Sequence, residues 1–335
     1  MSIKKIFALL LVLAMMLSLA ACGNTDTTQP TSKPAAETTE SPTEEVTEAP
    51  TVSLNKIVVY NSSLCPLLEA FGKADTIVGA YGSLAETYDV PSCGKWNEVD
   101  VEAVIATSAE ALFGYAKYTT EEQISKLKDA GISCYFIELS DADAAADEVA
   151  LLGQLFGCQE QAQIFVDLYQ TYDELLKERL ATVDELLTVY VEGTAKEPYK
   201  TANNTTAAHK LVTAAGLVNV YASNETAYPE RNLEAVIVAE PDVIVKLCSA
   251  STNPAEAYDS YVSELYGVAA ADNGKVILLN NEVGTTAIGS IIGRLYIAKF
   301  AYPDLFADVN VDEIYEELCI GFLNREFSGS GAYGK

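Results

Sequence analysis

The sequence contains a single histidine, no C-x-x-C pair and far fewer basic than acidic residues. Sites for bare zinc or manganese ions need several converging His and carboxylate ligands, so one histidine argues against them. The seven cysteines are widely spaced, which is not a zinc or iron–sulfur pattern. A formal net charge of −27 argues against binding nucleic acid or an anionic surface through bulk charge. The G-x-S-x-G, H-E-x-x-H and Walker signatures are all absent, so no enzyme class is indicated.

Long apolar runs are also missing, except for one at the N-terminus. Lys4 and Lys5 precede an apolar run that ends in Leu19-Ala20-Ala21-Cys22. This pattern predicts a secretory signal over residues 1–21. The cysteine directly after Leu-Ala-Ala resembles the lipoprotein signal of bacteria. That resemblance implies cleavage before Cys22, lipidation there, and a place on the extracytoplasmic face of the cell membrane. An ordinary signal peptide or an uncleaved membrane anchor remains the alternative.

Residues 22–53 form the next segment, which is rich in Thr, Ser, Pro, Glu and Ala and carries no aromatic residue. Such a composition cannot bury enough apolar surface to fold, so we expect a disordered acidic tether. The remainder, from Leu54 onwards, is long enough to bury a large core, and we expect it to form two domains.

The stretch from Gln159 to about Thr182 is the strongest helix signal in the chain. Between Gly157 and Gly193 there is neither glycine nor proline, and apolar residues recur at three- and four-residue spacing. The apolar positions are Phe165, Leu168, Tyr172, Leu175, Leu176 and Val183. We interpret this helix as a rigid connection between two lobes. The expected division is 54–158 for the N-terminal lobe, 159–186 for the connecting helix, 187–326 for the C-terminal lobe and 327–335 for a flexible tail.

Strand-like and helix-like segments alternate on both sides of this helix. The expected strands are 56–60, 76–79, 111–114 and 134–137 in the N-terminal lobe, and 188–192, 242–245 and 275–279 in the C-terminal lobe. Strands that alternate with helices indicate a parallel sheet with covered faces. The predicted fold is therefore α/β, with a mainly parallel sheet in each lobe and a ligand cleft between the lobes.

An internal repeat supports two related lobes. Residues 101–106, Val-Glu-Ala-Val-Ile-Ala, come shortly before the strand at 111, and residues 233–238, Leu-Glu-Ala-Val-Ile-Val, come at the same distance before the strand at 243. The second copy continues with Pro241-Asp242, whereas the first has Ala109-Glu110. We expect the two lobes to share one plan.

Three stretches carry a family resemblance that spans nearly all of residues 54–323. They are KIVVYNSSLCPLLEAFGKADTIVGA, YPERNLEAVIVAEPDVIVKL and LYIAKFAYPDLFADVNVDEIYEEL. In this order they resemble the class III, or helical-backbone, substrate-binding proteins of ABC importers for iron complexes, haem and cobalamin. Ala109-Glu110 departs from the family's Pro-Asp in the first copy.

The resemblance implies a function and a set of partners. A monomer without an intrinsic cofactor would capture a ferric siderophore, haem or cobalamin and deliver it to a membrane permease with its ATPase. Glu102 and Glu234 would be the exposed glutamates, one on each lobe, that dock onto permease arginines. The alternative for both is a solvated glutamate favoured by the start of a helix.

Loops just after strands supply the candidate ligand contacts, because ligands of open α/β sheets bind beyond the carboxyl ends of the strands. In the N-terminal lobe these are Asn61, Ser62, Tyr81, Trp96, Tyr115 and Tyr118. In the C-terminal lobe they are Tyr199, Lys200, Tyr228, Arg231 and Asn281. The only tryptophan, Trp96, offers a flat face to a macrocycle or chelate, or else plugs the edge of its lobe. Lys200 and Arg231 would hold a ligand carboxylate or phosphate, or else form surface ion pairs.

Two other functions are alternatives. A ligand sensor or scavenging surface lipoprotein could use the same fold without a transporter. An exported hydrolase or metalloenzyme is the weaker alternative, because the sequence shows no set of catalytic residues. His209 is expected to be a helix-face histidine with a local hydrogen bond rather than an iron ligand.

Overall fold

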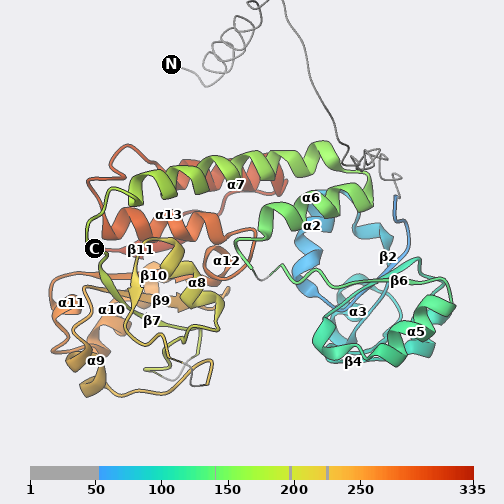
Figure 1. Cartoon of the computed structure of the whole chain (residues 1–335), viewed down its shortest axis with the longest axis horizontal. Helices are drawn as coiled ribbons and strands as arrows, with labels where there is room; N and C mark the ends of the chain where they lie inside the picture. Colours follow the sequence, from blue (N-terminus) through green and yellow to red (C-terminus); the bar gives the residue numbers. More distant parts are fainter. Residues whose placement is uncertain (1–52, 140, 196–197, 224–225) are drawn as a thin grey trace, which may run out of the picture. The chain divides into compact units, whose positions relative to one another are not determined.

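The computed structural model describes residues 53–139, 141–195, 198–223 and 226–335 (Figure 1). The signal sequence, Cys22 and the tether up to residue 52 lie outside this part of the chain, so the expectations for them remain predictions. Within the described residues, no helix is both long and apolar enough to cross a bilayer.

The N-terminal lobe is built on a four-stranded parallel sheet in the order β2-β1-β5-β6. Its strands are β1 (Ile57–Val59), β2 (Ile77–Ala80), β5 (Ala111–Phe113) and β6 (Ser133–Tyr135). Its helices are α2 (Cys65–Ala70), α3 (Gly82–Tyr88), α4 (Val101–Ala106) and α5 (Glu121–Asp129). A small hairpin, β3 (Gly94–Lys95) with β4 (Glu98–Val99), stands apart from the sheet and carries Trp96 between its strands.

The C-terminal lobe contains a five-stranded sheet in the order β11-β10-β9-β7-β8. Its strands are β7 (Thr188–Glu192), β8 (Val218–Asn219), β9 (Val243–Cys248), β10 (Val276–Asn280) and β11 (Ala332–Gly334). Its helices are α8 (Ala207–Ala214), α9 (Leu233–Ala239), α10 (Pro254–Glu264), α11 (Ala269–Asp272), α12 (Asn281–Gly284), α13 (Ser290–Ala301) and α14 (Val311–Glu317), which continues as a π-helical turn over Leu318–Phe322. All pairs are parallel except β10 with β11.

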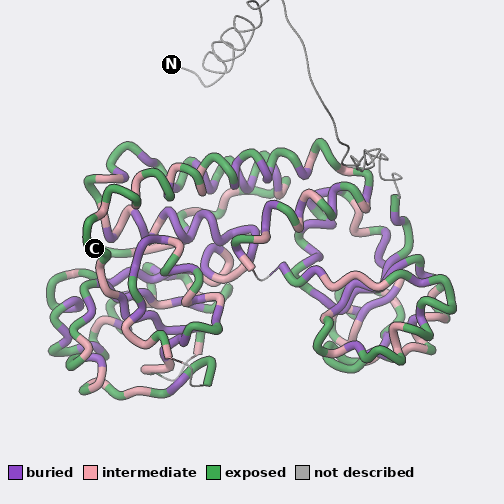
Figure 2. The backbone as a smooth tube through the Cα atoms, viewed as in Figure 1, coloured by how far each residue is buried: buried purple, intermediate pink, exposed green. Residues whose placement is uncertain are grey.

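The strands form because their residues are apolar on both faces. All three residues of β1 are buried, as are Val189, Tyr190 and Val191 of β7. Runs of Val, Ile and Leu that are buried on both sides are typical of parallel sheets covered by helices. Figure 2 shows the strands of both sheets as largely buried, while the exposed residues lie along the outer helices. The predicted α/β fold with two lobes is confirmed.

The two lobes repeat one plan, and their two central strands are separated by 132 positions. Ile57 of β1 pairs with Ala111 of β5, and Val189 of β7 pairs with Val243 of β9. The helices α4 and α9, which carry the sequence repeat, begin 132 residues apart as well. The order β2-β1-β5-β6 therefore corresponds to β8-β7-β9-β10, and β11 is an addition to the C-terminal lobe.

The connecting helix α7 spans Gln159–Leu180, 22 residues or about 33 Å. Its buried face packs on α6 (Ala145–Phe156) and α13. The ring of Phe165 lies 5.2 Å from that of Phe322, which in turn lies 6.2 Å from the ring of Phe71, the residue that follows α2. The end of the C-terminal lobe thus contacts the N-terminal lobe beside α7, so the connection is more than a single helix.

Arg294 of α13 adds a polar tie at the same place. This side chain is only 2% exposed, and its Nη1 and Nη2 lie 3.0 and 2.8 Å from Asp173 and Asp143 respectively. Asp173 belongs to α7, and Asp143 lies in the segment between β6 and α6. The ion pairs therefore join the C-terminal lobe to the helix and to the segment that leaves the N-terminal lobe.

One expectation about chain organisation is wrong. Residues 327–335 were expected to form a flexible tail, but Ala332–Gly334 form β11, which pairs antiparallel with β10. Gly329, with φ +108°, lies in the turn that brings the chain back to the sheet. The ring of Tyr333 then packs edge-on against Tyr258 at 5.1 Å, so burial of an aromatic ring holds the strand in place.

Candidate ligand-binding cleft

Two cavities lie near the carboxyl ends of the strands of both sheets, beside the segment between β6 and α6, which we call the connecting segment. The larger, about 620 Å³, we call the acidic cavity. It is lined by Glu138, Asp141, Glu148, Thr205, Thr206, Ala207, Lys210, Ala227 and Tyr228. The smaller, about 340 Å³, we call the Arg325 cavity, and it includes residues from α2, α12 and the segment after α14. Leu139 lines the smaller cavity and Asp141 the larger, so the connecting segment borders both.

The acidic cavity places three carboxylates against one cation. Lys210 of α8 lies with its Nζ 2.7 Å from Oδ2 of Asp141, and this contact lowers the pKa of the Asp141 carboxyl. Burial raises the pKa of Glu148, whose Oε2 also accepts a hydrogen bond of 3.2 Å from the backbone of Leu139. The Lys210–Asp141 pair joins the C-terminal lobe to the connecting segment. The cavity therefore suits hydrogen-bond donors or cationic groups better than anions.

An aromatic row leads from this cavity across the N-terminal lobe. The rings of Tyr115 and Tyr118 meet edge-on with centroids 6.1 Å apart, and Tyr118 meets Trp96 in the same way at 5.0 Å. Burial raises the pKa of Tyr115, and the nearby Tyr81 and Glu138 add to this effect. Glu138 lines the acidic cavity, so the row begins at its wall. Trp96 lies at the other end and is 50% exposed.

The hairpin that carries Trp96 has a specific backbone requirement. Gly94 adopts φ +116°, and a Cβ atom there would lie 2.4 Å from the carbonyl oxygen of Glu98. Only glycine fits this position. The tryptophan is therefore presented by a tight hairpin rather than by an irregular loop.

Tyr228 supplies the aromatic wall on the C-terminal lobe. It lines the acidic cavity and is 48% exposed. Its ring lies over Gly193, where an added Cβ would approach the ring to 3.0 Å. The C-terminal lobe thus contributes the one aromatic side chain in the lining of the acidic cavity, and the aromatic row of the N-terminal lobe lies beside that lining rather than in it.

Buried charges hold the loop after β7, which precedes α8. Lys246 Nζ lies 2.8 Å from Oε1 of Glu192 and donates to the carbonyl oxygens of Gly193 and Ala195 at 2.8 and 3.1 Å. Glu192 is 1% exposed, and its other oxygen accepts hydrogen bonds from the hydroxyls of Tyr190 and Tyr261. This cluster fixes the start of the loop that leads towards the acidic cavity.

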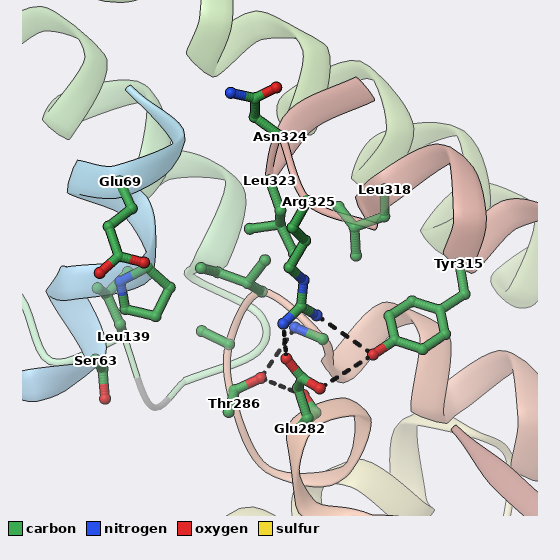
Figure 3. Close-up of a pocket in the computed structure, with 14 residues that line it drawn as sticks. Ser63, Glu69, Leu139, Glu282, Thr286, Tyr315, Leu318, Leu323, Asn324 and Arg325 are labelled. Carbon is green, nitrogen blue, oxygen red and sulfur yellow. Dashed lines mark hydrogen bonds and ion pairs between the residues drawn. The ribbon is translucent and has the colours of Figure 1, made fainter. Parts of the chain in front are cut away.

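The Arg325 cavity has apolar walls and one charged side (Figure 3). Arg325 forms an ion pair with Glu282 of α12, and Tyr315 donates a 3.3 Å hydrogen bond to the same carboxylate. Figure 3 shows Ser63 and Glu69 of the N-terminal lobe facing this group across the cavity. Arg325 and Glu282 balance each other's charge, and Glu69, which accepts a hydrogen bond from Tyr88, adds one further carboxylate to mainly apolar walls.

Of the predicted contact residues, Tyr228 alone lines one of the two cavities. Trp96, Tyr115 and Tyr118 form the aromatic row, and Tyr81 lies close enough to Tyr115 to raise its pKa. The remaining six also line neither cavity: Asn61, Ser62, Tyr199, Lys200, Arg231 and Asn281. The cation of Arg231 instead lies over the ring of Tyr221 at 5.0 Å.

Asn61 and Tyr199 require correction. Asn61 is fully buried, donates to the carbonyls of Ile137 and Glu138, and accepts from Ser63 and Tyr115. The hydrogen-bonding groups of its side-chain amide are therefore occupied by contacts within the protein, including two to the chain after β6. The hydroxyl of Tyr199 donates to the carbonyl oxygen of Glu264 at 2.8 Å, which fixes it within its own lobe. Both residues act as framework.

Several residues that line the cavities were not predicted from the sequence. Asp141, Glu148 and Lys210 lie in or beside helices rather than in loops directly after strands, and Arg325 follows the last helix. A charged residue on a helix has no sequence signal that separates a cleft wall from a solvated face. His209 makes the expected hydrogen bond, because its Nδ1 lies 3.2 Å from the side-chain amide of Asn219, and the expectation that it is not an iron ligand stays a prediction.

Glu102 and Glu234 occupy matching places on the two lobes. Asp100 caps α4 and Asn232 caps α9, each by accepting a hydrogen bond from the backbone three residues on. Both glutamates follow their cap by two positions and are exposed. The repeat in the sequence is thus a repeat in space within each lobe.

Comparison with known proteins agrees with this architecture. The model of the periplasmic binding protein family matches residues 57–283. The vitamin B12-binding protein of Yersinia pestis is 22% identical over 193 residues, which cover 57% of this chain and 68% of that protein.

Two solved structures show the same fold. The TroA-like periplasmic binding protein FepB of Veillonella parvula superposes with a TM-score of 0.72 at 18% identity, covering 84% of this chain and 95% of that chain. The molybdate-bound MolA of Haemophilus influenzae gives a TM-score of 0.63 at 18% identity, covering 83% and 95%. At this identity the likeness concerns the fold.

Proposed function

This chain belongs to the periplasmic binding protein family, and we propose that it is the binding component of an ABC importer. It captures a metal chelate, such as a ferric siderophore or haem, or cobalamin between its lobes, and delivers it to a membrane permease with its ATPase. The ligand is cargo rather than a cofactor, and the protein does not transform it.

The observation that carries this proposal is a carboxylate-lined cavity with an aromatic ring at its wall and an aromatic row beside it. Tyr228 lines the cavity, and Tyr115, Tyr118 and Trp96 form the row on the N-terminal lobe, whose Tyr115 lies near Glu138 of the lining. Flat aromatic faces suit a large planar ligand, which can stack or pack against them. A cavity of about 620 Å³ is within the usual range for small-molecule sites.

The charges of the acidic cavity sharpen the choice of ligand. Glu138 and Glu148 would repel the carboxylates of haem and of anionic siderophores, because like charges brought together out of bulk water are costly. The side-chain amides of cobalamin are neutral donors and acceptors that can pair with such carboxylates. We therefore propose cobalamin, or a related amide-rich corrinoid, ahead of the other two. The match to a vitamin B12-binding protein supports this order.

Titration of intrinsic fluorescence tests the ligand class directly, because Trp96 is the only tryptophan. Purified full-length protein in detergent is titrated with cyanocobalamin, haemin, ferrichrome and sodium molybdate. We expect saturable quenching by cyanocobalamin, at a concentration that rises at least tenfold in Tyr228→Ala. Tyr266→Ala is the matched control, since that exposed tyrosine lies outside both cavities. Quenching by none of the coloured ligands, or tight binding of molybdate by calorimetry, would contradict the proposed ligand class.

Delivery to a permease is proposed through Glu102 and Glu234. Cells carrying Glu102→Ala with Glu234→Ala should lose uptake while the purified variant still binds its ligand. The matched control is Glu160→Ala with Glu313→Ala, two exposed acids elsewhere. Normal uptake in the docking variant would favour the alternative of a sensor or scavenging surface lipoprotein.

Anchoring through Cys22 is proposed from the signal sequence. Metabolic labelling with an alkyne fatty acid should label the wild type, and Cys22→Ala should abolish the label and release the protein from membranes. Label that persists in Cys22→Ala would contradict this anchor.

The proposal that the protein does not transform its ligand has its own test. Ligand recovered after long incubation with the purified protein should be chemically unchanged.

A further inference from the structure

Three exposed apolar residues of the described chain lie near one proposed docking glutamate. Val238 is 81% exposed, Tyr266 is 73% and Ile237 is 37%. On α9, Glu234, Ile237 and Val238 stand at positions i, i+3 and i+4, so they share one face of the helix. Gly267 lies against the side chain of Ile237, which brings the Tyr266–Gly267 turn to the same helix. We call Ile237, Val238 and Tyr266 the apolar patch.

The matching place on the N-terminal lobe is charged instead. There α4 presents Glu102, Ile105 and Ala106 at the equivalent positions, and Ile105 is half-buried. Lys126 is close enough to Glu102 to interact with its charge, and it pairs with Glu122 at 2.8 Å. The repeat therefore conserves the glutamate but not its surroundings.

The folding of the C-terminal lobe does not account for the patch. Val236 is the fully buried residue of α9 and anchors the helix to its lobe, whereas Val238 has little contact with protein. Single exposed apolar side chains are ordinary, but a group of them next to a charged residue marks an interaction surface. We therefore infer that the apolar patch binds another molecule.

The geometry points to one occupant, and we propose that it is the permease of the importer. Ile237, Val238 and Tyr266 would pack on an apolar surface of the permease directly beside the cation that pairs with Glu234. This inference rests on the proposed function, because it extends the docking role of that glutamate. The N-terminal lobe would dock through charge alone.

Charge complementarity selects this partner over two others. Glu234 and Glu240 border the patch, and both are exposed. An anionic lipid surface would be repelled by these carboxylates and by the net charge of −27. A second copy related by symmetry would bring the same carboxylates together. A membrane protein with a cation next to an apolar surface satisfies both features.

The apolar patch also favours one of two possible orientations of the binding protein on the permease. Two equivalent glutamates on two equivalent lobes allow two docked orientations that exchange the lobes. An apolar contact available on only one lobe favours one of them. Charge pairs set register and encounter rate, whereas a desolvated apolar anchor adds the selectivity.

Site-specific photo-crosslinking of the full-length protein in its native cells tests the inference. p-Benzoylphenylalanine replaces Val238, its N-terminal-lobe counterpart Ala106, or the control residue Val218, which is 48% exposed on β8. We expect adducts from positions 238 and 106, identified by peptide mass spectrometry as an importer permease, and none from 218. An adduct from 106 without one from 238, or a 238 adduct to lipid or a second copy, overturns the inference and leaves the proposed docking intact. Adducts from neither position overturn both.

A second measurement quantifies the patch. With the crosslinker kept at position 106 as reporter, Val238→Ser with Tyr266→Ser should lower the permease adduct about tenfold, which is about 1.4 kcal/mol of docking free energy. Val218→Ser is the matched control and should leave the yield unchanged. An unchanged yield in the double variant overturns the inference. The variants change only exposed side chains, so their folding should be unaffected.

Discussion

Tyr60 in the N-terminal lobe and Glu192 in the C-terminal lobe occupy the same place, one residue past matching central-strand positions and 132 residues apart. Both are 1% exposed, yet they hold their lobes by different chemistry. The hydroxyl of Tyr60 donates to the carbonyl of Cys93 and accepts from the backbone of Asp100. Glu192 instead pairs with Lys246, whose ammonium also binds two loop carbonyls.

The difference follows from where each lobe carries its long loop. Cys93 and Asp100 flank the Trp96 hairpin, so Tyr60 fastens its base. Gly193 and Ala195 begin the loop between β7 and α8, so Lys246 fastens that one. One scaffold position thus anchors a cleft-bordering loop in each lobe. A neutral hydroxyl suffices for a hairpin with its own hydrogen bonds, whereas the irregular loop needs a cation that can bind several carbonyls.

The largest expected effect comes from removing the cation of the C-terminal lobe. Lys246→Met leaves Glu192 buried without its partner and should lower the free energy of unfolding by about 3–5 kcal/mol. Urea denaturation followed by circular dichroism measures this loss. Adding Glu192→Gln should recover a large part of it, because the uncompensated charge is then gone. Lys126→Met, which breaks an exposed pair with Glu122, is the control, with an expected change below about 1 kcal/mol. A similar loss in both lysine variants would contradict the role assigned to Lys246.

The N-terminal lobe should respond less to the matching change. Tyr60→Phe leaves the buried carbonyl of Cys93 without its donor and should cost about 1–3 kcal/mol. It should also loosen the Trp96 hairpin, which lowered tryptophan fluorescence anisotropy would show. Tyr266→Phe alters an exposed hydroxyl and serves as the control. If Tyr60→Phe cost as much as Lys246→Met, the two anchors would not differ in the way described.

At alkaline pH the buried tyrosines of the two lobes should lower the free energy of unfolding by different amounts. Burial raises the pKa of Tyr60, and burial with the charge of Glu192 raises the pKa of Tyr190 and Tyr261. Above about pH 10 these groups lose their protons in the unfolded chain but keep them in the folded protein. The unfolded state then binds fewer protons, so stability should fall by about 1.4 kcal/mol per pH unit for each tyrosine.

Denaturation curves between pH 9 and 11 check this slope. Tyr190→Phe with Tyr261→Phe should reduce the pH dependence about twice as much as Tyr60→Phe. The comparison uses the slope with pH and not the absolute stability, because the substitutions also remove hydrogen bonds. Equal slopes in all variants would show that these tyrosines do not govern the alkaline loss.

The smallest effect is expected at the start of β5 and β9. Asp242 accepts hydrogen bonds from the backbone and hydroxyl of Thr188, and Glu110 accepts one from the backbone of Asn55. Asp242→Ala should cost about 1 kcal/mol and Glu110→Ala about half of that. Thermal unfolding resolves such differences, and Asp242→Asn should retain part of the stability. A larger loss in Glu110→Ala would reverse the order.

Much of the scaffold was readable from the sequence because its signals are local. Apolar runs marked the strands, glycines marked several helix ends, and the Glu-Ala-Val-Ile repeat placed α4 and α9. The departure at Ala109-Glu110 also proves minor, since Glu110 and Asp242 both bind the backbone near the start of the neighbouring strand. α10 was missed, although Asn253 followed by Pro254 is a cap and first-turn signal.

The cleft was less predictable because its walls depend on packing across the two lobes. The rule that ligands lie beyond strand ends selected Tyr228, which lines the acidic cavity, and the aromatic row, which does not; ligand contact by either stays a prediction. It also selected Asn61 and Tyr199, whose polar groups are used within their own lobes. It could not find Lys210 or Glu148, which reach the cavity from helices. Only the arrangement in space shows which of many similar tyrosines and acids face the same volume.

The position of β11 has a consequence for the order in which the chain acquires its structure. The sheet of the N-terminal lobe is complete once Tyr135 has emerged during synthesis or export, whereas the sheet of the C-terminal lobe waits for residue 334. Domains that emerge first generally fold first. Between the emergence of Asn280 and that of Gly334 the chain would therefore carry one complete sheet and one whose β10 edge is still open to pairing, which is the interval when a chaperone would protect it most.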